Sequence, residues 1–286
     1  MSTILATPAP TPVARTVGRP VAVITGASAG IGAATALELA RRGYDLLLVA
    51  RREDRLAAVA QRVRQETAGT AAVELLAVDV AAPGASARIL DAAERAFGRF
   101  DVVFANAGYG LERPAHLTDG QALRAMFETN FFASVDLATQ AARRLESLGR
   151  PGHLLLCSSC VAKFTLPAFG AYSASKAAQA HIARAMAYEL APRRIRVSSV
   201  HPVTTSTEFF EVARGHSGPG GDDQYGIHGM SRFFVQRPEK VARAIARSIG
   251  TGRTEIWTSP LTRLAAGFIT AFPGIFDLAV RVSRRR

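Results

Sequence analysis

The 286-residue sequence contains only two cysteines, Cys157 and Cys160, in a C-x-x-C spacing. Two cysteines cannot form a disulfide framework, and their scarcity favours a reducing compartment, so we expect a cytoplasmic location. No metal site is predicted, because a structural zinc site needs about four ligands and there is no second cysteine pair. A redox centre usually needs a helix N-terminus that lowers the thiol pKa. Cys157 instead ends an apolar segment, where we expect it to behave as a small hydrophobic residue.

Lysine and aromatic residues are also scarce. Lysine occurs only at Lys163, Lys176 and Lys240, although the formal net charge is +12, so nearly all the positive charge is arginine. Aromatic residues make up 7% of the chain, which argues against a stacking platform for single-stranded nucleic acid. The basic residues are spread along most of the chain and are interpreted as a solvated surface, so no nucleic-acid partner is predicted.

Neither end of the chain carries a long uninterrupted apolar run. Residues 1–18 are rich in Pro, Thr and Ala and make a poor secretory signal, so they are predicted to form a flexible tail. Residues 259–286 are predicted to form an amphipathic C-terminal extension, in which Pro273 and Asp277 argue against a membrane-spanning helix. Its apolar face follows helical spacing at Leu261, Leu264, Ala265, Phe268, Ile269 and Phe272.

Three roles for this extension stay open. It could pack on the core or on a partner subunit, or it could act as a flap over the substrate site. It could also make weak contact with a membrane surface as an interfacial helix. The location is therefore predicted to be cytoplasmic, with a membrane-peripheral position as the alternative.

Short apolar segments alternate with longer helical patterns along the rest of the chain. Strands are expected at residues 21–25, 46–50, 73–80, 101–108, 153–159, 195–202 and 254–258. Helices are expected at residues 30–42, 53–66, 85–97, 119–147, 171–191 and 238–249. Near-continuous apolar strands between helices indicate a parallel sheet that is covered on both faces. The sequence therefore predicts an α/β fold: a single doubly wound Rossmann-type domain at residues 19–258, with a seven-stranded, mostly parallel sheet and helices on both faces.

A glycine-rich turn, TGASAGIG at residues 25–32, joins the first predicted strand to the first helix. Glycine at Gly26, Gly30 and Gly32 permits a tight turn and lets the backbone approach a pyrophosphate. The helix N-terminus offers free N–H groups to the same anion. The second predicted strand is followed by Arg51 and Arg52 rather than by an acid. Because a guanidinium can bind a 2′-phosphate through paired hydrogen bonds, NADP is predicted as the preferred cofactor, with NAD as the alternative.

Tyr172 and Lys176 lie four residues apart in a predicted helix, which places both on one helix face. A free phenol titrates near pH 10, and a nearby ammonium lowers its pKa, so the pair could transfer a proton near neutral pH. Ser159 ends the fifth predicted strand and could place a hydroxyl at the same crevice. Ser158 is the alternative, although it would point to the other face if the strand continued.

Seven short motifs occur together: TGASAGIG at 25–32, DV at 79–80, NAG at 106–108, ETN at 128–130, CSS at 157–159, YSASK at 172–176 and HPVTTST at 201–207. In this order they resemble the short-chain dehydrogenase/reductase family of NAD(P)-dependent enzymes. The resemblance covers roughly residues 19–258, and the combination is far more specific than any single motif.

The resemblance implies a role for each matching residue. Tyr172 would be the general acid/base, Lys176 would lower its pKa and hold the nicotinamide ribose, and Ser159 would bind the substrate oxygen. Asn130 would keep a water in the proton relay. The implied cofactor site consists of Gly26, Ser28, Gly30, Ile31, Gly32, Arg51, Arg52, Asp79, Val80, Asn106, Ala107, Gly108, Tyr172, Lys176, Pro202 and Thr207. Within it, Asp79 and Val80 would contact the adenine, Asn106 would frame the cleft and Thr207 would meet the nicotinamide carboxamide.

Two positions depart from the family pattern: Val203 stands where glycine is usual, and Ala105 where asparagine is frequent. Residues 208–236 are predicted to form a substrate lid. Phe209, Phe210, Phe233 and Phe234 in this segment indicate an apolar substrate, unless they only pin the loop to the core. His201 is a weaker candidate for a role in the pocket.

The sequence thus predicts an NADP-dependent oxidoreductase that transfers hydride between nicotinamide and a carbonyl or secondary alcohol, with Tyr172 as general acid/base. Its expected partners are a small, apolar molecule and further copies of the same chain, in a dimer or a tetramer. The alternative is a non-catalytic NADP-binding protein on the same fold. The identity of the substrate does not follow from the fold.

Overall fold

The computed structural model describes residues 18–203 and 236–283. Residues 1–17 of the predicted tail at 1–18, together with Thr207 and the four phenylalanines of the predicted lid, lie outside the described residues.

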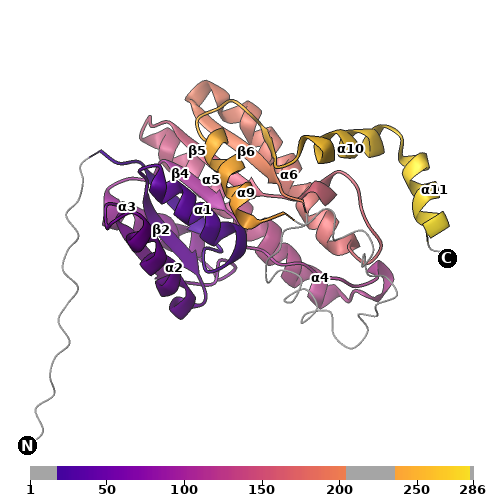
Figure 1. The fold of residues 1–286 in the computed structure, drawn as a ribbon, viewed down its shortest axis with the longest axis horizontal. Helices are drawn as coiled ribbons and strands as arrows, with labels where there is room; N and C mark the ends of the chain where they lie inside the picture. The colour runs from indigo at the N-terminus through magenta and orange to yellow at the C-terminus, as the bar shows by residue number, and fades with distance from the viewer. Residues whose placement is uncertain (1–17, 204–235, 284–286) are drawn as a thin grey trace, which may run out of the picture.

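A seven-stranded parallel sheet forms the centre of the molecule (Figure 1). Its strand order is β3-β2-β1-β4-β5-β6-β7. The strands are β1 (Val21–Thr25), β2 (Asp45–Ala50), β3 (Val73–Ala77), β4 (Val102–Ala105), β5 (Gly152–Cys157), β6 (Ile195–His201) and β7 (Glu255–Trp257). Every residue of β1, β2 and β4 is buried, as expected for parallel strands covered on both faces.

Helices cover both faces of this sheet. On one face, α1 (Gly30–Arg41), α2 (Glu53–Glu66) and α9 (Pro238–Ser248) bury apolar side chains against alternate residues of β1 and β2. On the other face, α3 (Ala85–Phe97), α5 (Ala133–Ser147) and α6 (Gly170–Leu190) form a second apolar cluster with the remaining strand residues. The predicted fold class is therefore confirmed, with a sheet that is parallel throughout.

Strands 3, 4 and 5 end at least two residues earlier than the sequence predicts, and the fifth ends at Cys157 rather than at residue 159. The third strand ends at Ala77 rather than at residue 80, and the fourth ends at Ala105 rather than at residue 108. In both cases the remaining residues leave the sheet at its carboxyl edge and line a cleft there, as Asp79 and Ala107 do.

The predicted helix at residues 119–147 has three parts. It begins with α4 (Gly120–Phe127), where Asp119 caps the N-terminus, and ends with α5. A π-helical turn, η2 (Glu128–Phe132), lies between them and carries Asn130. Such wide turns within α-helices are frequent at functional sites.

The C-terminal extension forms two helices, α10 (Pro260–Ala271) and α11 (Pro273–Ser283). Ser259 caps α10 by accepting a hydrogen bond from the Thr262 backbone N–H. Figure 1 shows this pair in yellow at one end of the molecule, where α11 extends beyond the body of the domain. Within the described residues no single helix is long and apolar enough to cross a membrane. The pair α10–α11 passes that test only jointly, across a 99° bend.

Candidate active site

A cleft of about 580 Å³ lies at the carboxyl ends of the strands. From β1 the chain adds β2 and β3 on one side of the sheet, and from β4 it adds β5, β6 and β7 on the other side, so the strand order reverses between β1 and β4. Doubly wound folds bind ligands at such a point. The cleft volume falls within the ~300–1,000 Å³ that ligand sites usually occupy.

The glycine turn forms one wall of this cleft and leaves no room for side chains. Gly26 has a φ of +65°, and a Cβ there would lie 2.9 Å from Asn106 Nδ2. A Cβ on Gly32 would lie 2.3 Å from the backbone oxygen of Gly26. Because Ala29 gives no side-chain cap, the first N–H groups of α1 are available for an anion.

Thr25 ties the ends of β1 and β4 together beneath this turn. Its hydroxyl oxygen accepts hydrogen bonds from the backbone N–H groups of Asn106, at 2.9 Å, and Ala107, at 3.0 Å. Asn106 in turn donates its side-chain amide to the Thr25 backbone oxygen at 3.0 Å. Sequence reasoning did not single out Thr25; the available signal was its place directly before Gly26.

Arg51 and Arg52 line the cleft beyond the end of β2. The Arg52 guanidinium donates to the Ser28 hydroxyl of the glycine turn at 3.3 Å. The Arg51 guanidinium lies 3.7 Å from the Asp79 carboxylate, and its side chain is 75% exposed. The two cations therefore border the glycine turn on one side and the end of β3 on the other.

Tyr172 and Ser159 meet at the opposite side of the cleft. Ser159 follows β5 and caps η3 (Cys160–Ala162), and its hydroxyl is hydrogen-bonded to the Tyr172 phenol. Burial raises the pKa of Tyr172 well above its usual value, and the hydrogen bond with Ser159 offsets only part of that rise. Ser158, the alternative serine, also lines the cleft, but its hydroxyl donates to the backbone oxygen of Lys176 at 2.8 Å.

Lys176 lies below Tyr172 on the same face of α6. Its ammonium donates to the Cys157 backbone oxygen at 2.6 Å and to Gln179 Oε1 at 3.4 Å. The Lys176 ammonium is 5.8 Å from the centroid of the Tyr172 ring. Burial lowers the pKa of this lysine. The sequence predicted that the charge of Lys176 lowers the pKa of Tyr172. In this structure burial outweighs that effect, because burial favours the neutral form of both Tyr172 and Lys176.

Asn130 is fully buried behind the cleft, where it fixes the loop after β4. Its side chain accepts from the Tyr109 backbone N–H and donates to the Tyr109 oxygen, both at 2.9 Å. Gly108 lies between this amide and the lysine: a Cβ there would be 2.8 Å from Asn130 Oδ1 and 3.4 Å from Lys176 Nζ. The π turn thus places the Asn130 amide on the other side of Gly108 from the Lys176 ammonium.

The two cysteines have no lowered pKa. Burial raises the pKa of the Cys157 thiol and raises that of Cys160 to about 11. Reactive thiols depend on a lowered pKa, so this environment suits the small hydrophobic role that was expected of Cys157.

The structure brings most of the predicted site residues into this one cleft. The predicted residues that line it are Gly26, Ser28, Gly30, Ile31, Arg51, Arg52, Asp79, Val80, Asn106, Ala107, Gly108, Ser159, Tyr172, Lys176 and Pro202. Gly32 and Asn130 lie directly behind the lining, and Thr207 is outside the described residues. The lining also includes residues that sequence reasoning missed, among them Tyr109, Thr129, Val161, Leu166 and Phe169.

These residues suit a dinucleotide. The uncapped N-terminus of α1 and the closely packed glycines form a cradle for a pyrophosphate, since any side chain at Gly26 or Gly32 would collide with backbone or amide atoms. The cradle continues past Asn106 to Tyr172 and Lys176 in the same cleft. The donor set therefore fits a nicotinamide cofactor that spans the switch point of the sheet.

Comparison with known proteins supports this interpretation. Residues 20–217 match the family model described as short chain dehydrogenase. The chain is 33% identical over 242 residues to 11-beta-hydroxysteroid dehydrogenase-like 3 of Arabidopsis thaliana, covering 84% of this chain and 73% of that protein.

Two solved structures are similar in fold and sequence. One is a short-chain dehydrogenase from Sphingobium yanoikuyae in complex with NADPH, with a TM-score of 0.73 and 27% identity over 90% of this chain and 95% of that one. The other is a short chain dehydrogenase from Mycobacterium paratuberculosis bound to NAD, with a TM-score of 0.71 and 26% identity over 83% of this chain and 95% of that one. The chain therefore belongs to the short-chain dehydrogenase/reductase family of NAD(P)-dependent oxidoreductases.

Proposed function

We propose that this enzyme interconverts a carbonyl group and a secondary alcohol on an apolar substrate, with NADP as its preferred cofactor. The observation that carries the proposal is the meeting of Ser159, Tyr172 and Lys176 in one cleft with the glycine turn. When bound, the nicotinamide would supply or accept the hydride.

Tyr172 would hold the proton that the substrate oxygen receives during reduction. Because burial raises the pKa of its phenol, the side chain is protonated at neutral pH and is a donor. Ser159, hydrogen-bonded to the phenol, would hold the substrate oxygen in reach of that proton. Proton transfer in the other direction would need a lower phenol pKa, which a closer approach of the Lys176 ammonium would provide.

An apolar substrate is supported by the walls around Tyr172. Its ring packs in a cluster of buried residues: Leu111, Met126, Cys160, Val161, Phe169 and Val203. Val161, Phe169 and Val203 also line the cleft. This support comes from residues other than the four phenylalanines of the predicted lid.

The preference for NADP is supported by the two guanidinium groups beyond the end of β2. Arg51 and Arg52 line the cleft, and Ala50 stands where an acid would bind ribose hydroxyls. A 2′-phosphate placed there would gain charge-assisted hydrogen bonds.

The Tyr172→Phe variant tests the reaction. It removes the proton donor but keeps the ring, so we expect kcat with a panel of apolar ketones to fall by about 10²–10⁴-fold. Binding of NADPH, measured by fluorescence titration, should stay within about threefold of the wild type, because the glycine turn is untouched. If the variant turns over ketones as fast as the wild type, Tyr172 is not the acid. If neither protein reduces any carbonyl but both bind NADPH, the non-catalytic alternative holds.

We also propose that the C-terminal extension contacts an anionic membrane surface. Most of the large apolar side chains of α10 and α11 face solvent: Leu261, Leu264, Phe268, Phe272, Ile275, Leu278 and Val282 are all at least 51% exposed. The pair turns Thr262 and Ala266 towards the body, together with Phe276, whose ring packs edge-on against that of Phe164 at 5.8 Å. The extension carries Arg263, Arg281 and a final run of three arginines, against one acid, Asp277, so an apolar face is combined with positive charge. A cytoplasmic or membrane-peripheral location and a homo-oligomeric state stay predictions.

A further inference from the structure

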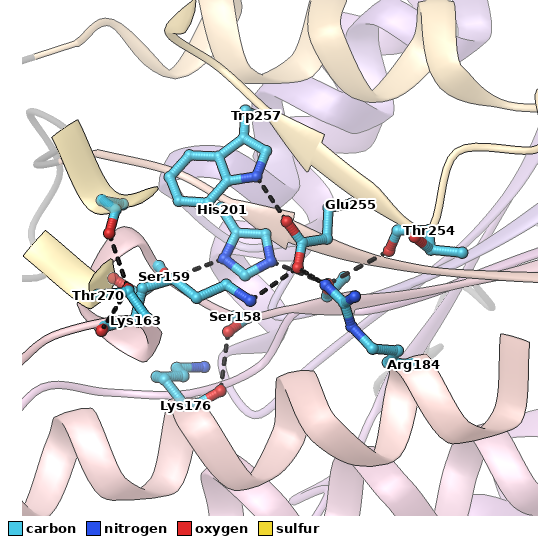
Figure 2. A network of polar contacts seen from close by, with 12 residues as sticks. Ser158, Ser159, Lys163, Lys176, Arg184, His201, Thr254, Glu255, Trp257 and Thr270 are labelled. Atoms are coloured by element: carbon cyan, nitrogen blue, oxygen red, sulfur yellow. Dashed lines mark hydrogen bonds and ion pairs between the residues drawn. The ribbon is translucent and has the colours of Figure 1, made fainter. Parts of the chain in front are cut away.

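A network of polar contacts surrounds the buried side chain of His201 and includes the cleft residue Ser159 (Figure 2). His201 ends β6 and has no exposed surface. Its Nδ1 lies 2.9 Å from the backbone oxygen of Ser159. Because a carbonyl oxygen can only accept, Nδ1 carries the proton, and Nε2 faces the Ser199 hydroxyl at 2.9 Å. The histidine is thus directly bonded to the residue that contacts the Tyr172 phenol.

The imidazole ring of His201 is held in place by Trp257. The two rings stack at 4.6 Å with an interplanar angle of 9°. His201 and Trp257 are directly paired residues of the neighbouring strands β6 and β7. The indole N–H of Trp257 donates to Glu255 Oε2 at 2.9 Å, which fixes the indole as well.

Glu255 connects this stack to two other elements. Its Oε1 accepts from the Lys163 ammonium at 2.7 Å and from the Arg184 guanidinium. Lys163 directly follows η3, and Arg184 lies on α6, the helix that carries Tyr172. The segment from Ser159 to Lys163 is therefore held at both ends, by His201 at its start and by Glu255 at its end.

We propose that His201, supported by Trp257 and Glu255, positions Ser159 for substrate binding. The inference rests on the proposed function, in which Ser159 holds the substrate oxygen. His201 is not among the residues that line the cleft, so it would act through the Ser159 backbone as a positioning residue and not as a catalytic one. The carboxylate of Glu255 would set the far end of the same segment.

The charges in the network agree with this role. Burial alone would raise the pKa of Glu255, but hydrogen bonds from Lys163 and Trp257 hold it at about 2, so the carboxylate is ionised at neutral pH. Burial lowers the pKa of His201 to about 4, although Ser159 and Glu255 oppose that shift while Lys163 and Arg184 assist it. The ring is therefore neutral, with one proton that the Ser159 carbonyl fixes on Nδ1.

Two amide substitutions at position 201 separate this role from a merely structural one. In His201→Asn the amide nitrogen can take the place of Nδ1 and still donate to Ser159. In His201→Gln the amide reaches towards Ser199 instead, so Ser159 loses its donor. We expect kcat for ketone reduction to fall about tenfold in His201→Gln and to stay within about threefold in His201→Asn. The dissociation constant of NADPH should be unchanged in both.

His153 provides a matched control. It is also a buried histidine with a pKa of about 4, and it is bonded to Ser198 at 2.8 Å, but it lies near the amino end of β5 and outside the cleft lining. His153→Gln should lower the melting temperature without changing kcat. Equal losses of kcat in His201→Asn and His201→Gln, or a comparable loss in His153→Gln, would overturn the proposal.

Alkylation of Cys160 tests the same contact without an assay of turnover. Cys160 directly follows Ser159 and is 8% exposed, so N-ethylmaleimide should modify it slowly in the wild-type protein. Displacement of the segment should raise the rate of Cys160 modification about tenfold in His201→Gln and in Glu255→Gln. Peptide mass spectrometry measures this rate and distinguishes Cys160 from Cys157. The rate should not rise in His201→Asn or His153→Gln. If no variant changes the rate, His201 does not hold the segment, whether or not the enzyme reduces ketones.

Discussion

At the scale of single residues, Tyr172 and Lys176 show what spacing can and cannot predict. Their separation of four residues correctly places both at the cleft, since a helix brings such positions onto one face. Spacing says nothing of burial, however, and burial raises the pKa of Tyr172 and lowers that of Lys176. Desolvation depends on the neighbours contributed by other elements, so only the folded chain reveals that it exceeds the charge effect.

The two serines after β5 show the same difference between what the sequence predicts and what the folded chain decides. The sequence favoured Ser159 over Ser158 by strand alternation. The strand in fact ends at Cys157, and Ser158 instead bonds to the backbone of Lys176. The contact between Ser159 and His201 was beyond sequence reasoning, because 42 residues separate them along the chain.

Cofactor preference can be tested at Arg51. Its side chain is 75% exposed and lies 3.7 Å from the Asp79 carboxylate, so replacement by aspartate should leave the fold intact. We expect Arg51→Asp to raise KM for NADPH about tenfold or more, since a charge-assisted bond is lost and repulsion from the 2′-phosphate is added. KM for NADH should change less than about threefold.

The control for this variant is Arg62→Asp on α2, an exposed arginine outside the cleft lining. It changes the net charge equally, so it should leave both KM values unchanged. An unaltered ratio of the two KM values in Arg51→Asp would show that Arg51 does not read the 2′-phosphate.

At the scale of elements, helix bounds were predicted more closely than strand bounds. The predictions for residues 53–66 and 85–97 match α2 and α3. Each has an apolar stripe at helical spacing, which a sequence displays directly. Strands 3 and 4 were predicted too long because Val78, Val80 and Ala107 are apolar and continue the strand pattern. These residues leave the sheet to line the cleft. The π turn at Asn130 has no signal of its own in the sequence.

The extension offers a test at this scale. Leu264 on α10 is 71% exposed and Phe268 is 52% exposed, so Leu264→Glu combined with Phe268→Glu should fold normally. Burying a large apolar side chain contributes about 1.5–3 kcal/mol, and the added charges repel anionic lipid. We therefore expect co-sedimentation with phosphatidylserine-containing vesicles to fall at least about tenfold.

Leu148→Glu is the matched control for the extension, because Leu148 is 58% exposed at the end of α5. It should bind vesicles as the wild type does. Light scattering on the same proteins distinguishes the alternative: if the double variant changes the oligomer mass and the wild type does not bind vesicles, the apolar face is a subunit interface.

At the scale of the whole molecule, the alternation of apolar strands and helices was sufficient to predict a doubly wound sheet, because a parallel sheet must be covered on both faces. The hydrophobic pattern could not predict the polar contacts that join β6 and β7 to the segment after β5. The sequence offered His201 only as a weaker candidate for a role in the pocket, and nothing in the pattern singled out His153. The fold buries both, on strands whose neighbours come from distant parts of the chain.

These two histidines make the stability of the whole molecule depend on pH. In the folded state burial lowers the pKa of each to about 4, with Arg196 assisting at His153, whereas an unfolded histidine titrates near pH 6.5. Between these values the unfolded chain binds more protons than the folded one, so stability is complete above pH 6.5 and is lost as the pH falls towards 4.

From pH 7.5 to pH 5.5 we expect a loss of about 1.3 kcal/mol for each histidine, measured as the free energy of unfolding in urea. Carboxylates such as Glu255, with a pKa of about 2, contribute only at lower pH. His153→Gln should reduce this pH dependence by about half. Equal stability of the wild-type protein at both pH values would mean that the histidines are not held neutral inside the fold.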